Sequence, residues 1–287
     1  MNSNRPVKIA IQEDMLPGPT LEDRFHQAAD LGLQGIEFWS QTLPEQANSI
    51  EQLSGTGGIV AASINNGQRS RFLDPNLDER KRALSELKEA MTLAGRIGAS
   101  GVVFVPHFFE PLLPDLSPWM DSISVERGLL TAQLEELADH AQAESVQLWV
   151  EPVNRYETHL LNRLQDAASL ISGLSHPNLG IVADFFHMAL EEPDILAALL
   201  RFQPVSFKTA FISLPSASRT ALFLTSLRGG KVLFSSGSTA SALASFGRPE
   251  ILLVSLPSNS SLRVSQSPSS INRPTTFLSS LTLPGQG

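Results

Sequence analysis

The chain has 287 residues, of which 42% are hydrophobic, and it carries no cysteine and a formal net charge of −8. This length fits one large α/β barrel or two smaller domains, and the apolar content exceeds that of disordered chains. The absence of cysteine excludes disulfides, thiolate metal sites and cysteine nucleophiles. Met1–Val7 has no charged start followed by an apolar run, and no segment reaches the roughly 18 apolar residues of a membrane span. We therefore expect a cytoplasmic protein with no membrane partner.

Short apolar runs alternate with amphipathic stretches through the first 200 residues. In chain order the pattern predicts strand Val7–Gln12, helix Leu21–Leu31, strand Gly35–Trp39, helix Pro44–Leu53, strand Gly58–Asn65, helix Asp78–Ile97, strand Gly101–Pro106, helix Val125–Ala143, strand Val146–Val153, helix Leu164–Leu174 and strand Leu179–Asp184. Ser124 is the expected N-cap of the fourth helix. Regular strand–helix alternation of this kind predicts a parallel sheet with helices outside it.

Two arrangements of such a sheet compete: an open doubly wound sheet and an eight-stranded TIM (β/α)8 barrel. The glycine-rich phosphate turn of a dinucleotide-binding sheet is missing from the early part of the chain. Polar residues instead gather at the carboxyl ends of the predicted strands, where TIM barrels hold their active sites. They are Gln12, Glu13, Glu37, Asn65, His107, Glu151 and Asp184. We therefore favour the barrel.

Two segments concentrate the residues that can do chemistry. Trp149–His159 (WVEPVNRYETH) places Glu151 at the end of an apolar strand and Glu157 on the following loop, whereas Val182–Glu192 (VADFFHMALEE) places Asp184 at a strand end. His187 follows Asp184 by three residues, and we expect it in a loop. Carboxylates combined with one imidazole suit Mn²⁺, Mg²⁺ or Co²⁺, and a carboxylate beside such an ion can move a proton next to a carbonyl.

The run Glu151–His159 resembles the fifth strand and loop of the sugar phosphate isomerase/epimerase family, the xylose-isomerase-like barrels that include ketose 3-epimerases and hydroxypyruvate isomerase. The Asp-x-x-His-Met run that begins at Asp184 resembles the sixth-strand motif of the same family. The interval of 33 residues between Glu151 and Asp184 fits one βα unit, and the resemblance covers about residues 6–200.

The resemblance implies a metal-dependent isomerase or epimerase that acts on a keto-sugar or a related hydroxy-carbonyl compound through a cis-enediolate. Glu151 would be a metal ligand and a catalytic acid/base group, and Asp184 a second ligand. Glu157 and His187 would bind substrate, and His107, directly after the fourth strand, is a further substrate-binding candidate. The family forms both dimers and tetramers, so the resemblance implies a homodimer or a homotetramer.

The resemblance weakens after residue 200. The family's seventh strand ends in His-x-His-x-x-Asp-x-x-Arg, whose second His is the third metal ligand, and its eighth strand ends in a Glu that is the fourth. The best superposition is Phe211–Arg219 (FISLPSASR), which retains Arg219, a substrate-binding position, but has Phe211, Ser213 and Ser216 in place of His, His and Asp. Glu250 precedes the apolar run Ile251–Val254 instead of following it.

Composition changes at the same point. Residues 1–200 carry a net charge of −15, whereas residues 201–287 carry +7 and contain 20 serines, one Glu, no Asp and no His. We therefore expect residues 1–200 to form the first six βα units, and residues 201–287 to be an atypical Ser/Pro-rich basic segment in which the last two units are degraded. A reading-frame change near residue 201 is one explanation, and a genuine divergent tail is the other. Either would impair the metal site.

Two other functions compete with the sugar isomerase/epimerase. A non-catalytic sugar-binding barrel would keep the pocket without the missing ligands. An endonuclease-IV-like DNA repair barrel would need several further His ligands, but the third strand ends in Ile64-Asn65-Asn66. The acidic first 200 residues also oppose binding to a phosphate backbone, so we expect no nucleic-acid partner.

Overall fold

The computed structural model describes residues 8–67 and 69–202, and beyond them the backbone of five strands between residues 207 and 254. The strands are β1 (Lys8–Gln12), β2 (Gly35–Trp39), β3 (Val60–Asn65), β4 (Gly101–Phe104), β5 (Gln147–Val150), β6 (Leu179–Asp184), β7 (Phe207–Ile212), β8 (Phe223–Leu224), β9 (Lys231–Ser236), β10 (Ala240–Ser245) and β11 (Ile251–Val254). The helices are α1 (Leu21–Asp30), α2 (Leu43–Leu53), α3 (Leu77–Ile97), α4 (Ser122–Ala143), α5 (Leu164–Ser172), α6 (Phe185–Glu191) and α7 (Ile195–Phe202), with short 3-10 turns at Glu13–Met15 and Thr56–Gly58.

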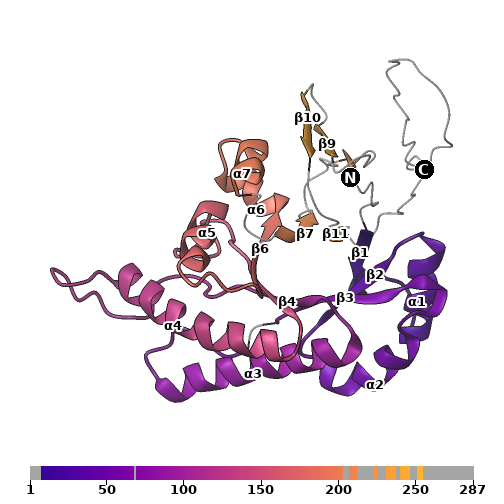
Figure 1. Ribbon diagram of the computed structural model, residues 1–287, viewed down its shortest axis with the longest axis horizontal. Helices are drawn as coiled ribbons and strands as arrows, with labels where there is room; N and C mark the ends of the chain where they lie inside the picture. The colour runs from indigo at the N-terminus through magenta and orange to yellow at the C-terminus, as the bar shows by residue number, and fades with distance from the viewer. Residues whose placement is uncertain are drawn as a thin grey trace, which may run out of the picture.

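Eight of the strands close a parallel barrel in the order β1-β11-β7-β6-β5-β4-β3-β2. Figure 1 shows the helices that follow the first five strands outside the curled sheet, with α3 and α4 running along its lower side. The barrel prediction is therefore confirmed. The last units also depart from the regular pattern, because an antiparallel sheet of β8, β9 and β10 lies between β7 and β11 in the chain where a helix belongs.

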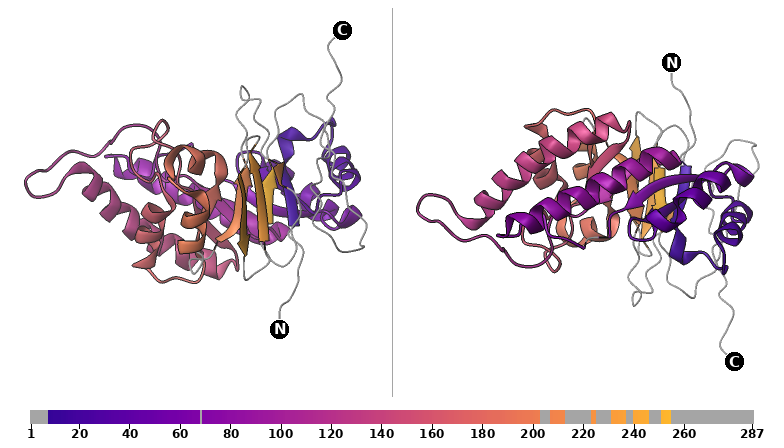
Figure 2. Two further views of the ribbon diagram at one scale, coloured as in Figure 1. Left: turned by 90° about the horizontal axis from the view of Figure 1, so that it is seen from above. Right: turned by 90° about the horizontal axis from the view of Figure 1, so that it is seen from below.

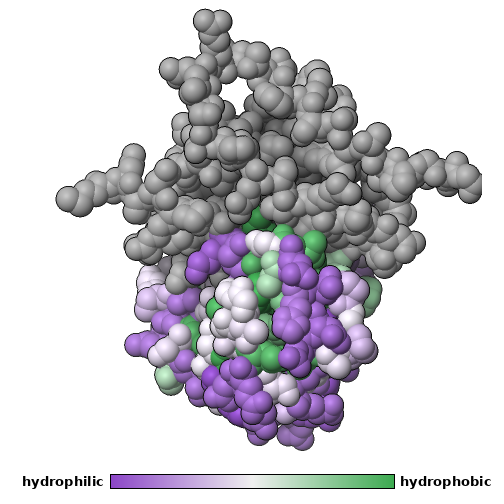
Figure 3. All heavy atoms as spheres, turned by 90° about the vertical axis from the view of Figure 1, so that its right-hand side faces the viewer, coloured by the Kyte–Doolittle hydropathy of each residue, from purple (hydrophilic) through white to green (hydrophobic). Residues whose placement is uncertain are grey.

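The amphipathic helices bury one face each against the barrel. In α1 the side chains of Phe25 and Ala28 are buried, and in α3 the buried residues recur at helical spacing. Polar residues cover most of the described surface in Figure 3, which looks at the molecule from the right-hand side of Figure 1. Within the residues that the structure describes, no helix combines the length and the apolarity needed to cross a membrane.

The start of α4 differs from the prediction. The helix begins at Ser122, and its N-cap is Asp121, whose carboxylate accepts a hydrogen bond from the Ser124 backbone N–H at 2.8 Å. The prediction of Ser124 as the N-cap is therefore wrong: its backbone N–H donates to the side chain of the N-cap residue Asp121. The connection from β4 into this helix projects from the body of the molecule, at the left of both views in Figure 2.

Side chains that point into the barrel form two stacked layers. The lower layer is a separate buried cluster of Ala10, Ala62, Val103, Trp149 and Val182. Because side chains alternate along a strand, the residues two positions later also point inward, one layer closer to the carboxyl ends of the strands. That second layer is polar: Gln12 follows Ala10, Glu151 follows Trp149, and Asp184 follows Val182. The candidate site therefore lies on an apolar floor.

Candidate metal and substrate site

Glu151 and Asp184 form one wall of the polar layer at the mouth of the barrel. Both side chains are buried, and they extend from the adjacent strands β5 and β6. Ligand atoms of Glu151, Asp184 and His187 all lie within 4.8 Å of one another. The structure thus brings together three of the residues that the two sequence motifs single out.

His187 lies in helix α6 and not in a loop, so that part of the prediction is wrong. Asp184 caps this helix, because its carboxylate accepts hydrogen bonds from the backbone N–H groups of Phe186 at 2.7 Å and His187 at 3.4 Å. The same carboxylate that faces the site therefore also starts the helix that carries His187. The local Asp-x-x-His spacing is what positions the imidazole over the strand end.

Glu157 approaches His187 from the loop after β5. Its Oε1 atom lies 3.8 Å from Nδ1 of His187, and the side-chain amide of Asn154 donates a hydrogen bond to the same Oε1 atom at 2.8 Å. Arg155 in this loop is bound by Glu191 at the end of α6, with Nε–Oε1 and Nη2–Oε2 distances of 2.9 and 2.8 Å. Hydrogen bonds and an ion pair thus hold the loop after β5 next to helix α6, which carries the imidazole of His187.

Burial governs the protonation of the carboxyl groups at the mouth. It raises the pKa of Asp184 to about 7 and that of Glu151 well above its usual range, and in Glu151 the charges of Asp184, Glu37 and Glu157 raise the pKa further. Among the described residues, the charges that act on these two groups are those of other carboxylates. A buried acidic pair of this kind fits a divalent cation, which would supply the missing positive charge.

Glu37 lies at the candidate site, although the sequence motifs assign it no role. Its carboxyl group is fully buried on β2, where Gln12 donates to Oε1 at 3.2 Å and the Ser63 hydroxyl donates to Oε2 at 2.7 Å. Burial raises the pKa of Glu37 to about 8, and the charge of Asp184 adds to the shift. In the sequence, Glu37 stands among the polar residues at the ends of the predicted strands. No motif around it distinguishes it from a carboxylate exposed to solvent.

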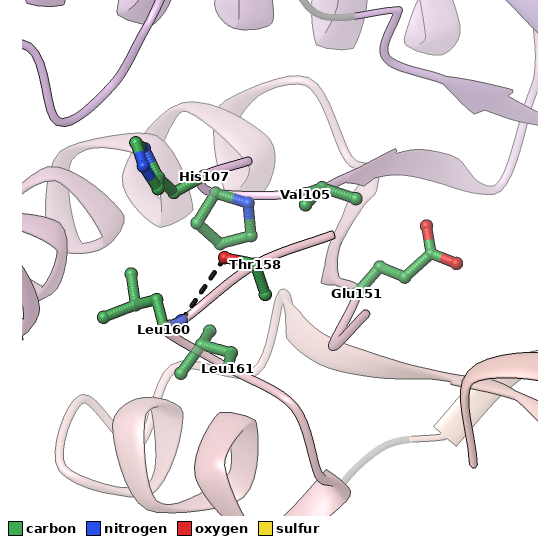
Figure 4. A pocket seen from close by; sticks show the side chains of 7 residues that line it. Val105, His107, Glu151, Thr158, Leu160 and Leu161 are labelled. Carbon is green, nitrogen blue, oxygen red and sulfur yellow. Dashed lines mark hydrogen bonds between the residues drawn. The ribbon is translucent and has the colours of Figure 1, made fainter. Parts of the chain in front are cut away.

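His107 lines a small pocket with Glu151, Thr158 and Leu160. It does not belong to the group formed by Glu151, Asp184 and His187. Its Nε2 atom lies 2.8 Å from the carbonyl oxygen of Glu110, and burial lowers its pKa. In Figure 4 the Glu151 carboxylate points away from the imidazole of His107. The ring instead packs edge-on against His159, with centroids 5.2 Å apart. Its role as a substrate contact stays a prediction.

The loops after β4 and β5 are paired with each other. The Phe109 N–H donates to the carbonyl of Glu157 at 2.6 Å, and the His159 N–H donates to the carbonyl of Phe109 at 3.3 Å. The imidazole of His159 also shares a hydrogen bond with the carboxyl group of Glu126, whose side chain is completely buried in α4. This arrangement supports the loop that carries Glu157.

At the level of Asp184, the residues contributed by the last two strands are apolar in sequence. Phe211 on β7 is the residue in register with Asp184, and Leu253 on β11 is in register with Phe211. At the level of Asp184, the seventh and eighth strands therefore offer neither a carboxylate nor an imidazole. Arg219 and Glu250, the other two residues considered from the sequence, lie outside the described residues.

Comparison with known proteins shows the family to which this barrel belongs. A family model described as "Xylose isomerase-like TIM barrel" matches residues 25–210. The chain is 24% identical over 197 residues to 3-dehydro-D-guloside 4-epimerase of Escherichia coli, covering 67% of this chain and 74% of that protein. It is 24% identical to D-psicose 3-epimerase of Ruminiclostridium cellulolyticum, covering 60% of each protein. A solved D-allulose 3-epimerase from Methylomonas sp., in complex with D-allulose, superposes with a TM-score of 0.68 at 17% identity, over 87% of this chain and 84% of the other. The chain belongs to the xylose isomerase-like TIM barrel family.

Proposed function

We propose that the chain is a sugar isomerase or epimerase that acts on a keto-sugar or a related hydroxy-carbonyl compound. The observation that carries the proposal is the cluster of Glu151, Asp184 and His187 at the barrel mouth, with Glu157 beside it. Relatives named as 4-epimerases and 3-epimerases of sugars support the reaction class. A small sugar is thus the proposed partner, and a cytoplasmic location and a homodimer or homotetramer remain predictions.

Glu151 and Asp184 are the residues that would hold a divalent metal ion, Mn²⁺, Mg²⁺ or Co²⁺. The donor set fits, because two buried carboxyl groups extend from adjacent strands with their oxygen atoms close together. When bound, the ion would supply positive charge that stabilises the negative charge developing on a substrate carbonyl.

The chain's own residues would move the proton. Glu151 would remove a proton from the carbon next to the carbonyl, which gives a cis-enediolate, because a carboxylate within reach of that carbon can act as a general base. Glu157 and His187 would bind the hydroxyl and carbonyl oxygens of the sugar, and Arg219 and His107 are further proposed contacts. The apolar layer below Glu151 would exclude water from that side of the bound sugar.

A non-catalytic sugar-binding barrel is the second candidate. Phe211 and Leu253 stand at the level of Asp184 on the last two strands, so two acidic ligands from β5 and β6 would hold an ion weakly. In this alternative the cleft keeps its sugar contacts but lacks the second acid/base group. For the catalytic proposal, the altered C-terminal segment after residue 200 would impair the activity of this chain.

Solvent exchange tests the catalytic proposal. The purified chain, with Mn²⁺, is incubated in deuterated water with ketohexoses and ketopentoses, and deuterium at the carbons beside the carbonyl is measured by NMR. We expect incorporation that falls by about 10²–10⁴-fold in Glu151→Gln, because the amide cannot accept the proton. Glu45→Gln, at an exposed position of α2, is the matched control and should exchange like the unaltered chain.

Addition of a chelator separates the two candidates. Exchange that stops with chelator and returns with Mn²⁺ supports the metal-dependent reaction. Sugar binding that persists with chelator, without any exchange, supports the binding barrel. Equal exchange rates in Glu151→Gln and in the unaltered chain would contradict the assignment of Glu151.

A further inference from the structure

Asn154 is the residue of the fifth-strand motif to which the proposed function gives no role. It follows β5, the residue is 2% exposed, and its side chain lies between Glu157 and His187. A buried amide between a carboxylate and an imidazole must satisfy two donors and one acceptor, so its orientation controls which nitrogen of the imidazole can carry a proton.

The orientation of the Asn154 amide follows from a backbone group. The Tyr156 N–H donates to Oδ1 of Asn154 at 3.0 Å, and a backbone N–H can only donate. Oδ1 must therefore face Tyr156, which leaves the NH₂ group facing Oε1 of Glu157 and Nδ1 of His187, both at 2.8 Å. Each hydrogen of the amide then has one acceptor.

Nδ1 of His187 consequently faces two donors. The second is the backbone N–H of Asn154, at 3.2 Å from Nδ1. A hydrogen on Nδ1 would point at both donors, so Nδ1 has to present its lone pair. In a neutral imidazole the proton then resides on the other nitrogen, Nε2.

Nε2 is the nitrogen that faces the acidic pair. It lies 3.9 Å from Oδ2 of Asp184, which is too far for a hydrogen bond and leaves room for an atom of a ligand. A nitrogen that carries a proton has no lone pair for a metal ion. We infer that Asn154 is a positioning residue that keeps the proton of His187 on Nε2, so that His187 serves as a hydrogen-bond donor to a sugar oxygen and not as a metal ligand. The inference rests on the proposed function only for the identity of that oxygen.

The ion pair of Arg155 with Glu191 holds this geometry in place. Arg155 follows Asn154 directly, and Glu191 ends the helix that carries His187. The Arg155 backbone N–H also donates to Oε1 of Glu191, at 2.7 Å. The backbone N–H of Asn154 is therefore anchored where it meets Nδ1.

The tautomer can be measured without any catalysis. The full chain is labelled with isotopic histidine, and long-range proton–nitrogen correlation spectra report which ring nitrogen carries the proton; the signal that His187→Gln removes identifies His187. We expect the proton on Nε2 in the unaltered chain. Asn154→Asp puts a carboxylate opposite Nδ1 and should move the proton to Nδ1. Asn162→Ala is the matched control, because Asn162 supports the same loop through the carbonyls of Val153 and Thr158 and should leave the tautomer unchanged.

A proton on Nδ1 in the unaltered chain would overturn the inference, and so would an equal change of tautomer in Asn154→Asp and Asn162→Ala. In a chain that exchanges deuterium, Asn154→Asp should lower the rate about 10²-fold, as loss of one aligned donor does in other enzymes. An inactive chain with the proton on Nε2 supports this inference and contradicts the proposed function, so the two can fail separately.

Discussion

Glu37 is a carboxylic acid kept neutral by its surroundings. It is fully buried on β2, and its pKa of about 8 lies far above the ordinary value of 4.5. Gln12 and Ser63 supply hydrogen bonds that favour the charged form, yet burial outweighs both. One wall of the barrel mouth is therefore uncharged at neutral pH, opposite the acidic wall of Glu151 and Asp184.

The raised pKa makes the stability of the chain depend on pH. Between about pH 4.5 and pH 8 the unfolded chain has released the Glu37 proton while the folded chain retains it, so the free energy of unfolding falls as pH rises. Glu37→Gln removes the titrating group; its amide oxygen can accept from Gln12, and its NH₂ group can donate to the hydroxyl oxygen of Ser63. We expect this variant to gain on the order of a few kcal/mol over the unaltered chain at pH 8, and little at pH 4.5.

Urea unfolding with chelator present, at several pH values, measures this difference. Glu45→Gln, at an exposed position of α2, is the matched control for the loss of one carboxylate. A difference between Glu37→Gln and the unaltered chain that does not change from pH 4.5 to pH 8 would show that Glu37 titrates normally in the folded state.

The grouping of individual candidate residues was predictable where the sequence carries a specific pattern. Glu151, Glu157, Asp184 and His187 stand in two dense motifs, and the structure brings all four together. Glu37 stands alone at a strand end, and only the packing of three strands around it reveals its burial. Sequence spacing does not report the environment that sets a pKa.

At the scale of elements, Gly101 controls how closely β4 and β5 approach. A Cβ atom at this position would lie 2.2 Å from the backbone oxygen of Gln147, its partner in the sheet register. Because that contact is with backbone, it can be relieved only by moving the strands. We expect Gly101→Ala to destabilise the chain by about 1–3 kcal/mol in thermal or urea unfolding.

Gly128 gives the matched substitution. It lies on an exposed position of α4 where an added Cβ meets nothing within 4 Å, so Gly128→Ala should stabilise the chain by about 0.5–1 kcal/mol. A destabilisation of equal size in both variants would mean that the close approach of β4 and β5 is not what requires Gly101.

Element types followed from periodicity more closely than element ends did. The strand predicted from Gly58 begins at Val60, because Gly55, Gly57 and Gly58 adopt positive φ angles of 94°, 61° and 79° that form a turn. The strand predicted to reach Val153 ends at Val150. Apolar composition continues past both ends, so hydrophobic pattern alone does not mark where hydrogen bonding to the sheet stops.

At the scale of the whole molecule, the composition changes at residue 201. The part of the chain before this residue carries the family motifs, and the part after it does not. The six strands up to Asp184 are predictable from alternation, whereas β7 and β11 complete the barrel with segments that lack the family's strand-end residues. Closure of the ring depends on backbone pairing and apolar runs, which many sequences satisfy. Ligand identity depends on individual side chains, and therefore does not follow from closure.

Sequencing of the gene tests the origin of this segment. We propose that residues 201–287 arise from a reading-frame change, and we expect another frame downstream of residue 200 to encode His-x-His-x-x-Asp-x-x-Arg and a later strand ending in Glu. The restored chain should then bind Mn²⁺ and interconvert ketoses. If no frame encodes these motifs, the segment is genuine, and the sugar-binding barrel becomes the better description.

The pairing of the loops after β4 and β5 also bears on motion. Phe109 exchanges backbone hydrogen bonds with Glu157 and His159, and His159 is anchored by the buried Glu126. A fluctuation that swings the projecting connection outward must either break these bonds or carry Glu157 away from His187. Entry and release of a sugar on this side would therefore proceed by opening of the two loops as one gate, at a rate set by their shared hydrogen bonds.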